Sequence, residues 1–157
     1  MEDYALFAGG CFWGLEAAFS ALPGVLFTRV GYAGGDTANP TYKDVCRELT
    51  GHAETVLVIY DPQVITYKQL LEAFFSFNEG GCACEDLDSY GSQYRSIVFY
   101  NSEEERKTAQ DLINLLNKSA VYDTYICTAL VKTKNFYLAE EYHQQYYEKH
   151  GLLDAFC

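Results

Sequence analysis

The chain has 157 residues, of which 49% are hydrophobic and 21% are charged. This composition is typical of a folded globular chain and excludes an intrinsically disordered one. Eleven basic residues against 22 acidic ones give a net charge of −11 at pH 7, which repels phosphate backbones and anionic lipid surfaces. We therefore expect neither a nucleic acid nor a membrane as a partner.

We expect one domain, residues 1–157, in which residues 151–157 form a mobile C-terminal tail. The first residues include two acids where a secretory signal needs basic residues, and no uncharged run reaches the length of a membrane span. The sequence therefore predicts a cytoplasmic protein. Thiols stay reduced in that compartment, so the six cysteines indicate chemistry or burial more than a structural disulfide framework.

The predicted elements are short apolar runs that alternate with helix-length stretches. In chain order they are a strand at 4–8, a helix at 11–22, strands at 25–33 and 54–60, a helix at 67–78, a strand at 95–100, a helix that Ser102 and Glu105 cap and that reaches residue 117, a strand at 124–131 and a helix at 138–149. The first six elements have the order βαββαβ. We therefore predict an α+β fold, a ferredoxin-like plait with a mixed sheet and an additional C-terminal strand and helix.

Cys11 follows two glycines and stands at the first turn of a predicted helix. Free backbone N–H groups and the helix dipole stabilise a thiolate at such a position and lower the thiol pKa. We interpret Cys11 as a nucleophile; the alternative is a small buried residue at a tight turn. The next two residues, Phe12 and Trp13, either wall an apolar pocket beside the thiolate or pack into the core.

The segment Gly10-Cys11-Phe12-Trp13-Gly14 resembles the signature of the A-type peptide methionine sulfoxide reductases. Five more segments resemble this family in the same order, at 31–35 (GYAGG), 39–42 (NPTY), 50–54 (TGHAE), 93–96 (QYRS) and 139–144 (AEEYHQ). The resemblance implies a ferredoxin-like plait with extra elements, in agreement with the predicted order. It also implies thiol-dependent reduction of methionine-S-sulfoxide, peptide-bound or free, with no metal and no organic cofactor.

The resemblance further implies a role for each matching residue. Cys11 would attack the sulfoxide sulfur and become a sulfenic acid. Glu54 would protonate the departing oxygen, to which Tyr32 and Tyr94 would donate hydrogen bonds. The aromatic pair after Cys11 would hold the S-methyl group.

Glu54 has a further argument from its neighbours in the sequence. It opens the apolar strand at 54–60, and a carboxyl group against so apolar a run should have a raised pKa. The alternative is an exposed carboxylate at the edge of a strand. Two histidines in the matching segments are interpreted as structural. His52 is expected to be a hydrogen-bonding residue, and His143 a satisfied core or interface residue.

Three more cysteines are candidates to resolve a sulfenic acid on Cys11. Cys82 and Cys84 lie in a glycine-led loop, and Cys157 ends the tail, where members of the family often carry a resolving cysteine. The alternative for these three residues is an incidental thiol. A metal site at Cys82 and Cys84 is disfavoured because the second thiol pair or the histidines of structural zinc are missing.

The loop at 78–91 departs from the family pattern. Ser89 stands where most members have an aspartate, and Asp88 and Asp86 are displaced from that position. This departure leaves the preference between free and peptide-bound substrate open. We expect a monomer that thioredoxin or a similar dithiol recycles. The alternatives are a reductase of free or other small sulfoxides and a redox-sensing binding module that no longer turns over.

Overall fold

The structure is a computed structural model that describes residues 2–10, 12–35, 38–46, 52–77, 96–119, 126 and 128–150, without the side chains of Asp44 and Cys46. Its strands are β1 (Asp3–Ala8), β2 (Val25–Ala33), β3 (Ala53–Tyr60), β4 (Ile97–Tyr100), β5 (Ala129–Lys132) and β6 (Phe136–Leu138). Its helices are α1 (Phe12–Ser20), α2 (Tyr42–Cys46), α3 (Tyr67–Phe77), α5 (Glu103–Ser119), α6 (Tyr146–Lys149) and the 3-10 turn η3 (Glu141–His143).

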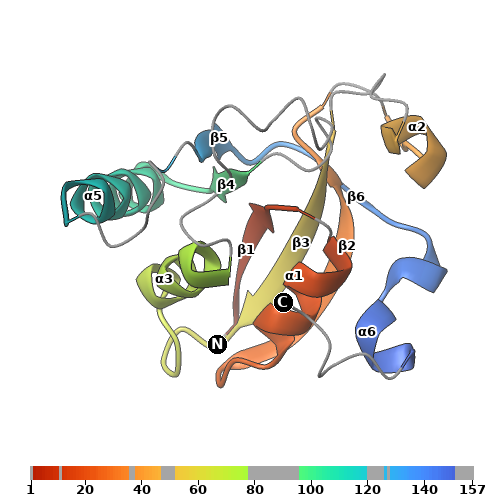
Figure 1. Ribbon diagram of the computed structural model, residues 1–157, viewed down its shortest axis with the longest axis horizontal. Coiled ribbons are helices and arrows are strands. Elements are labelled where there is room, and N and C mark those ends of the chain that lie inside the picture. Colours follow the sequence, from red (N-terminus) through yellow and green to blue (C-terminus); the bar gives the residue numbers. More distant parts are fainter. Residues whose placement is uncertain are drawn as a thin grey trace.

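The six strands form one sheet in the order β5-β4-β1-β3-β2-β6 (Figure 1). The four central strands have antiparallel neighbours, and so does β6 on β2. Only β5, which runs parallel to β4, makes the sheet mixed. The central order β4-β1-β3-β2, with α1 after β1 and α3 after β3, is that of two interlocked split βαβ units. The predicted α+β class with a mixed sheet is confirmed.

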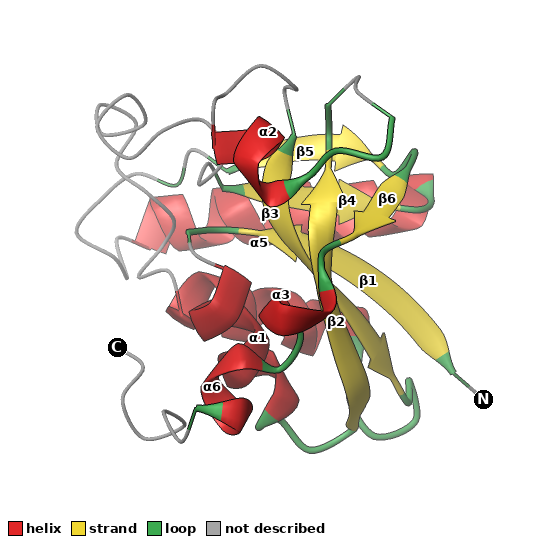
Figure 2. Ribbon diagram, turned by 90° about the vertical axis from the view of Figure 1, so that its right-hand side faces the viewer, coloured by secondary structure: helices red, strands yellow, loops and turns green. Residues whose placement is uncertain are grey.

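The three longer helices α1, α3 and α5 cover one face of this sheet (Figure 2). Side chains alternate between the two faces of a strand, and those that point toward the helices form the larger core. Phe7, Val56 and Val98 pack there with Phe19 of α1 and Leu70 of α3. Glu54 and Tyr32 stand on this same helix-facing side, two residues along their strands from Val56 and Val30. The fold therefore places both polar side chains in the apolar layer.

One predicted element is wrong in the C-terminal part. A helix over 138–149 was expected, but the chain forms the end of β6, then η3, then the short α6. The reason is the pairing of β6 with β2, which is possible because residue 31 is glycine: a Cβ there would lie 2.3 Å from the Tyr137 carbonyl oxygen. The strand expected at 124–131 is β5, which starts at Ala129 and follows the register of β4.

The ends of the other helices agree with the prediction within a few residues. Ser102 accepts a hydrogen bond from the Glu105 N–H at 3.2 Å, which is the expected cap of α5. The short α2 lies between the predicted strands at 25–33 and 54–60, where no helix was predicted, and the N–H of its first residue, Tyr42, donates to the distant Glu140. None of the helices among the described residues is long and apolar enough to cross a membrane.

Candidate active site

The turn from β1 to α1 leads to the predicted nucleophile. Gly10 has a φ of +76°, a left-handed conformation that glycine adopts at little cost. The chain passes through this turn from a buried strand to the first residue of α1, Phe12, whose side chain is fully buried. Cys11, between them in the sequence, lies outside the described residues.

Glu54 lies at the beginning of β3 and is 1% exposed. Its Oε1 accepts the backbone N–H of Phe12 at 3.1 Å, so the carboxyl group lies against the N-terminus of α1. Its Oε2 has no hydrogen-bond partner among the described residues. Burial raises the pKa of Glu54 to about 7, although the hydrogen bond from Phe12 opposes the rise. The expectation of a raised pKa agrees with this geometry, which provides a proton donor near neutral pH.

Tyr32 faces Glu54 across the pair of strands β2 and β3, where the two residues are direct partners. Tyr32 is fully buried, and its hydroxyl donates to Glu140 Oε1 at 2.9 Å. Burial, together with the neighbouring Glu140, raises the pKa of Tyr32. The hydroxyl therefore keeps its proton and remains a hydrogen-bond donor.

Glu140 is a site residue to which the sequence reasoning gave no role. One of its oxygens binds the Tyr32 hydroxyl, and the other accepts the Tyr42 N–H at 3.1 Å. Burial favours a higher pKa, but hydrogen bonds from its own N–H, from Tyr42 and from Tyr32 outweigh burial and lower the pKa of Glu140. The group is therefore an anion at neutral pH. Its only sequence signal is its position within the segment 139–144.

Trp13 contacts two residues of the segment that follows β6, residues 139–150, which we call the C-terminal segment. Its Nε1–H donates to His143 Nδ1 at 2.9 Å, and its ring stacks on Tyr146 at 3.9 Å with an angle of 9°. The imidazole of His143 also lies beside Phe12 and Tyr42, with ring centroids 5.2 and 4.5 Å away. Phe12 and Trp13 therefore share one aromatic cluster, in which Phe12 is a fully buried core residue and Trp13 is partly buried.

His143 is fully buried, and its Nε2 has no partner among the described residues. The prediction of a core residue is confirmed, and the satisfied atom is Nδ1, which accepts the Trp13 N–H. Burial lowers the pKa of His143, and the nearby Glu140 opposes this effect only in part. His52 is structural as predicted: its Nδ1 accepts the Gly35 N–H at 3.0 Å.

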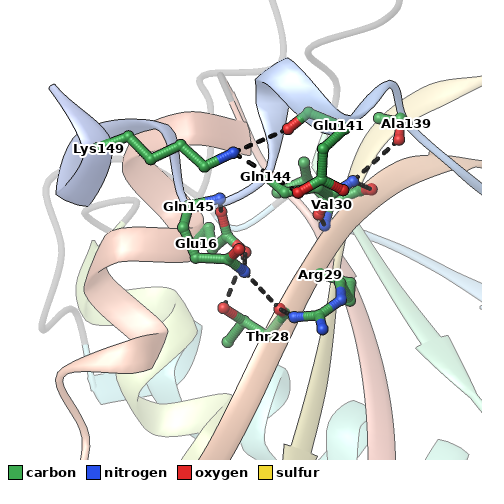
Figure 3. Close-up of polar contacts among 9 residues, drawn as sticks. All are labelled: Glu16, Thr28, Arg29, Val30, Ala139, Glu141, Gln144, Gln145 and Lys149. Carbon is green, nitrogen blue, oxygen red and sulfur yellow. Dashed lines mark hydrogen bonds and ion pairs between the residues drawn. The ribbon is translucent and has the colours of Figure 1, made fainter.

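The segment that carries these residues is fastened to β2 by the side chain of Gln144 (Figure 3). Its Oε1 accepts the Val30 N–H at 2.8 Å, and its Nε2 donates to the carbonyl oxygens of Val30 and Ala139 at 2.9 and 3.0 Å. The amide thus satisfies backbone groups of β2 just beyond the three residue pairs of β6. The side-chain oxygen of Gln144 thus accepts the Val30 N–H, which the backbone of a longer β6 would otherwise bind.

A second fastening joins the same segment to α1 through the buried Glu16 (Figure 3). One carboxylate oxygen accepts the Gln145 N–H at 2.7 Å, and the other accepts Gln145 Nε2 at 2.9 Å and the Thr28 hydroxyl at 2.8 Å. Burial raises the pKa of Glu16, while these hydrogen bonds act in the opposite direction. Sequence patterns gave no indication of this contact, which spans 129 positions.

The structure therefore brings together part of the predicted site. Glu54, Tyr32, Phe12 and Trp13 lie around the N-terminus of α1 and the C-terminal segment. The nucleophile, the second tyrosine and the resolving candidates lie outside the described residues: Cys11, Tyr94, Cys82, Cys84 and Cys157. Within the described part of the chain, no three His, Cys, Asp or Glu side chains are grouped so as to hold a metal ion.

Known proteins are similar to this chain in sequence and in fold. A family model described as peptide methionine sulfoxide reductase matches residues 3–155. The chain is 46% identical over 151 residues to the peptide methionine sulfoxide reductase MsrA of Methanosarcina acetivorans, covering 96% of this chain and 80% of that protein. It is 31% identical to reduced Mxr1 of Saccharomyces cerevisiae, with a TM-score of 0.81, covering 96% of this chain and 86% of that one.

Mxr1 has also been solved in complex with Trx2; that structure matches with 24% identity and a TM-score of 0.61, covering 92% of this chain and 84% of that one. At this identity the match supports the fold alone. The family model, by contrast, extends over nearly the whole sequence and includes every described element of the site. The chain belongs to the peptide methionine sulfoxide reductase family.

Proposed function

We propose that the chain reduces methionine-S-sulfoxide, peptide-bound or free, to methionine. The observation that carries the proposal is Glu54, a buried carboxyl group with a pKa of about 7 that lies against the first N–H of α1. A sulfoxide loses its oxygen only when that oxygen is protonated or strongly hydrogen-bonded. Glu54 would supply the proton, and Cys11, which precedes the first residue of α1 in the sequence, would supply the thiolate.

In the proposed reaction, the thiolate of Cys11 attacks the sulfoxide sulfur while Glu54 supplies a proton to the oxygen. The attack forms a bond between the two sulfur atoms, and the protonated oxygen leaves as water. A water molecule then attacks the Cys11 sulfur, so that the sulfur–sulfur bond breaks, the sulfide departs and a sulfenic acid remains on Cys11. The sulfoxide is thereby reduced by two electrons and the thiol is oxidised by two. Glu54 regains its proton from the thiol that ionised, so the sum is sulfoxide plus thiol giving sulfide plus sulfenic acid.

The proposed role of Tyr32 is to donate a hydrogen bond to the same oxygen, together with Tyr94. In the structure the Tyr32 hydroxyl donates to Glu140. Because a hydroxyl has one proton to donate, Tyr32 must exchange Glu140 for the substrate oxygen when a sulfoxide binds. The exchange replaces one hydrogen bond by another, so we expect it to cost little. Phe12 and Trp13 supply the apolar wall for the S-methyl group.

Recycling would proceed through a second thiol. Cys157, or one of Cys82 and Cys84, would condense with the sulfenic acid on Cys11 to give a disulfide and one water. A dithiol of the thioredoxin type would then reduce that disulfide and become a disulfide itself. The complex of Mxr1 with Trx2 is a precedent for such a donor in a protein of the same fold.

A single-turnover assay without reductant tests the proposal. The wild-type chain should convert one equivalent of methionine-S-sulfoxide, free or within a peptide, and should leave the R epimer unchanged. Cys11→Ser should convert none, because a serine hydroxyl provides almost no anion at neutral pH. Turnover by this variant above the solvent background would remove Cys11 from the mechanism. Mapping the disulfides formed in the wild-type reaction would identify the resolving thiol.

A further inference from the structure

The edge of the Trp13 indole is bound by a residue 130 positions later in the chain. Trp13 Nε1–H donates to His143 Nδ1 at 2.9 Å. Indole nitrogen is only a donor, so the imidazole must be the acceptor in this pair. The bond therefore exists only while Nδ1 carries no hydrogen, which requires the neutral ring with its hydrogen on Nε2. Burial of His143 favours this neutral form.

His143 is held in place independently of Trp13. The next residue, Gln144, is hydrogen-bonded through its side chain to both backbone groups of Val30 on β2. The residue after that, Gln145, is hydrogen-bonded to Glu16 on α1 (Figure 3). Two consecutive fastenings leave the imidazole little freedom. The hydrogen bond consequently fixes the indole relative to the sheet, and the indole does not fix the histidine.

The indole has few other means of keeping its orientation. Its face is stacked on Tyr146, and stacking tolerates sliding and rotation within the plane of the rings. Trp13 is only partly buried, so core packing does not surround it completely. The hydrogen bond to His143 is the one directional contact of the indole among the described residues. Without it, only the stacking on Tyr146 and the side-chain torsions of Trp13 would set the position of the ring.

We propose that His143 is a positioning residue that sets the orientation of the Trp13 indole and, through it, the shape of the subsite for the S-methyl group. This inference rests on the proposed function, since it takes Trp13 as a wall of the sulfoxide pocket. His143 contacts Trp13 by a hydrogen bond, whereas the proton donor Glu54 is bonded to Phe12 instead. The expected consequence is a change in substrate binding with little change in the chemical step.

Three substitutions of His143 separate the two ring nitrogens. His143→Asn places an amide oxygen near the position of Nδ1, His143→Gln places an amide near the position of Nε2, and His143→Leu removes both. We expect the leucine and glutamine variants to raise KM by roughly tenfold, the size of one lost buried hydrogen bond, with kcat changed by less than about threefold. The asparagine variant should restore KM to within about threefold of wild type.

Fluorescence gives a readout that a merely structural role would not produce. Trp13 is the only tryptophan of the chain, so indole emission reports this one side chain. The wild type and His143→Asn should show the same emission maximum and the same protection from acrylamide. His143→Leu and His143→Gln should show emission shifted to longer wavelength and stronger quenching. An unchanged indole signal in the leucine variant, together with a raised KM, would overturn the proposal.

The remaining outcomes are also decisive. Rescue by glutamine and not by asparagine would mean that Nε2 acts on the substrate directly, which contradicts a role through Trp13. In a Trp13→Phe background, His143→Leu should have no further effect on KM; an undiminished effect contradicts the proposal as well. Thermal unfolding of each variant identifies those that fold. If the leucine variant does not fold, the asparagine and glutamine pair carries the test.

Failure of the proposed function would be recognised separately. In that case the wild-type chain would reduce no sulfoxide at all. The indole emission of the asparagine and glutamine variants would still decide whether His143 fixes Trp13.

Discussion

Two carboxyl groups of the site lie in opposite kinds of surroundings. Glu54 stands on β3 inside the apolar layer, with a single hydrogen bond and an Oε2 that has no partner among the described residues. Glu140 stands on the C-terminal segment and accepts hydrogen bonds from Tyr32 and Tyr42. The pKa of Glu54 is raised to about 7, and the pKa of Glu140 is lowered.

The difference in pKa indicates different roles for Glu54 and Glu140. When the surroundings of two titratable groups move their pKa values apart, the group with the raised value is the acid and the other remains charged. Glu54 is therefore suited to give a proton, and Glu140 is suited to orient donors without giving one. The sheet with α1 would thus carry the chemistry of the site, and the C-terminal segment would carry the orientation of Tyr32 and Trp13.

The largest effect is expected from Glu54→Gln, which keeps the shape of the side chain and removes the acidic proton. We expect the single-turnover rate to fall by about 10² or more, because general acids contribute between about 10² and 10⁴. Glu72→Gln makes the same substitution on the exposed side of α3 and is the matched control, with an unchanged rate. A loss of less than about threefold in Glu54→Gln would reverse the assignment of the acid.

The same substitution should stabilise the protein at alkaline pH. Below pH 4.5 the carboxyl group is protonated in both the folded and the unfolded chain, so it does not lower the free energy of unfolding. Above it the unfolded chain ionises while the folded chain does so only near pH 7, so stability falls as the pH rises between these values. At pH 8 the ionisation of Glu54 lowers the free energy of unfolding by about 3 kcal/mol, and Glu54→Gln should restore this amount. Urea unfolding at pH 4 and pH 8 checks this; equal stabilisation at both would contradict it.

A smaller effect is expected from Glu140→Gln. The amide is a weaker acceptor for the Tyr32 hydroxyl and presents its NH₂ to one of the two donors, so Tyr32 should be oriented less well. We expect the single-turnover rate to fall by roughly three- to tenfold. Glu141→Gln, at an exposed neighbouring position, should have no effect. In a Tyr32→Phe background, Glu140→Gln should cost nothing more; the same loss in both backgrounds would show that Glu140 acts through another residue.

The sheet-bound half of the site was predictable because its signals are local. A short apolar run placed β2 correctly at 25–33, and the apolar run after Glu54 indicated the raised pKa of that residue. The order βαββαβ then followed from the sequence of elements. These signals survive because strands and long helices bury one continuous face, which a single sequence records at a fixed period.

The C-terminal half was not predictable in the same way. A helical pattern was expected over 138–149, but hydrogen bonds to residues more than 100 positions away decide the structure there. Val30 binds Gln144 across 114 positions and Glu16 binds Gln145 across 129. Such hydrogen bonds leave no period in the sequence, and residue 145 even adopts a left-handed backbone with a φ of 48°. The resemblance over 139–144 marked the segment without giving the role of Glu140.

The smallest effect concerns the face of the Trp13 indole, in contrast to its edge. Tyr146 stacks on this face at 3.9 Å, whereas His143 binds the edge. Tyr146→Phe keeps the ring and should leave KM unchanged. Tyr146→Leu removes the stack, and we expect KM to rise by about threefold, the lower end for an aromatic pair because Tyr146 is only partly buried.

The two variants at this position separate stacking from hydrogen bonding. If the edge contact alone orients the indole, Tyr146→Leu should alter the intensity of Trp13 emission but not its quenching by acrylamide, because His143 still holds the ring. A KM increase in Tyr146→Leu as large as that in His143→Leu would mean that the face contact matters equally. The C-terminal segment would then orient Trp13 by packing as much as by its hydrogen bond. In that case the two halves of the site would both depend on packing, and would differ less than their hydrogen bonds suggest.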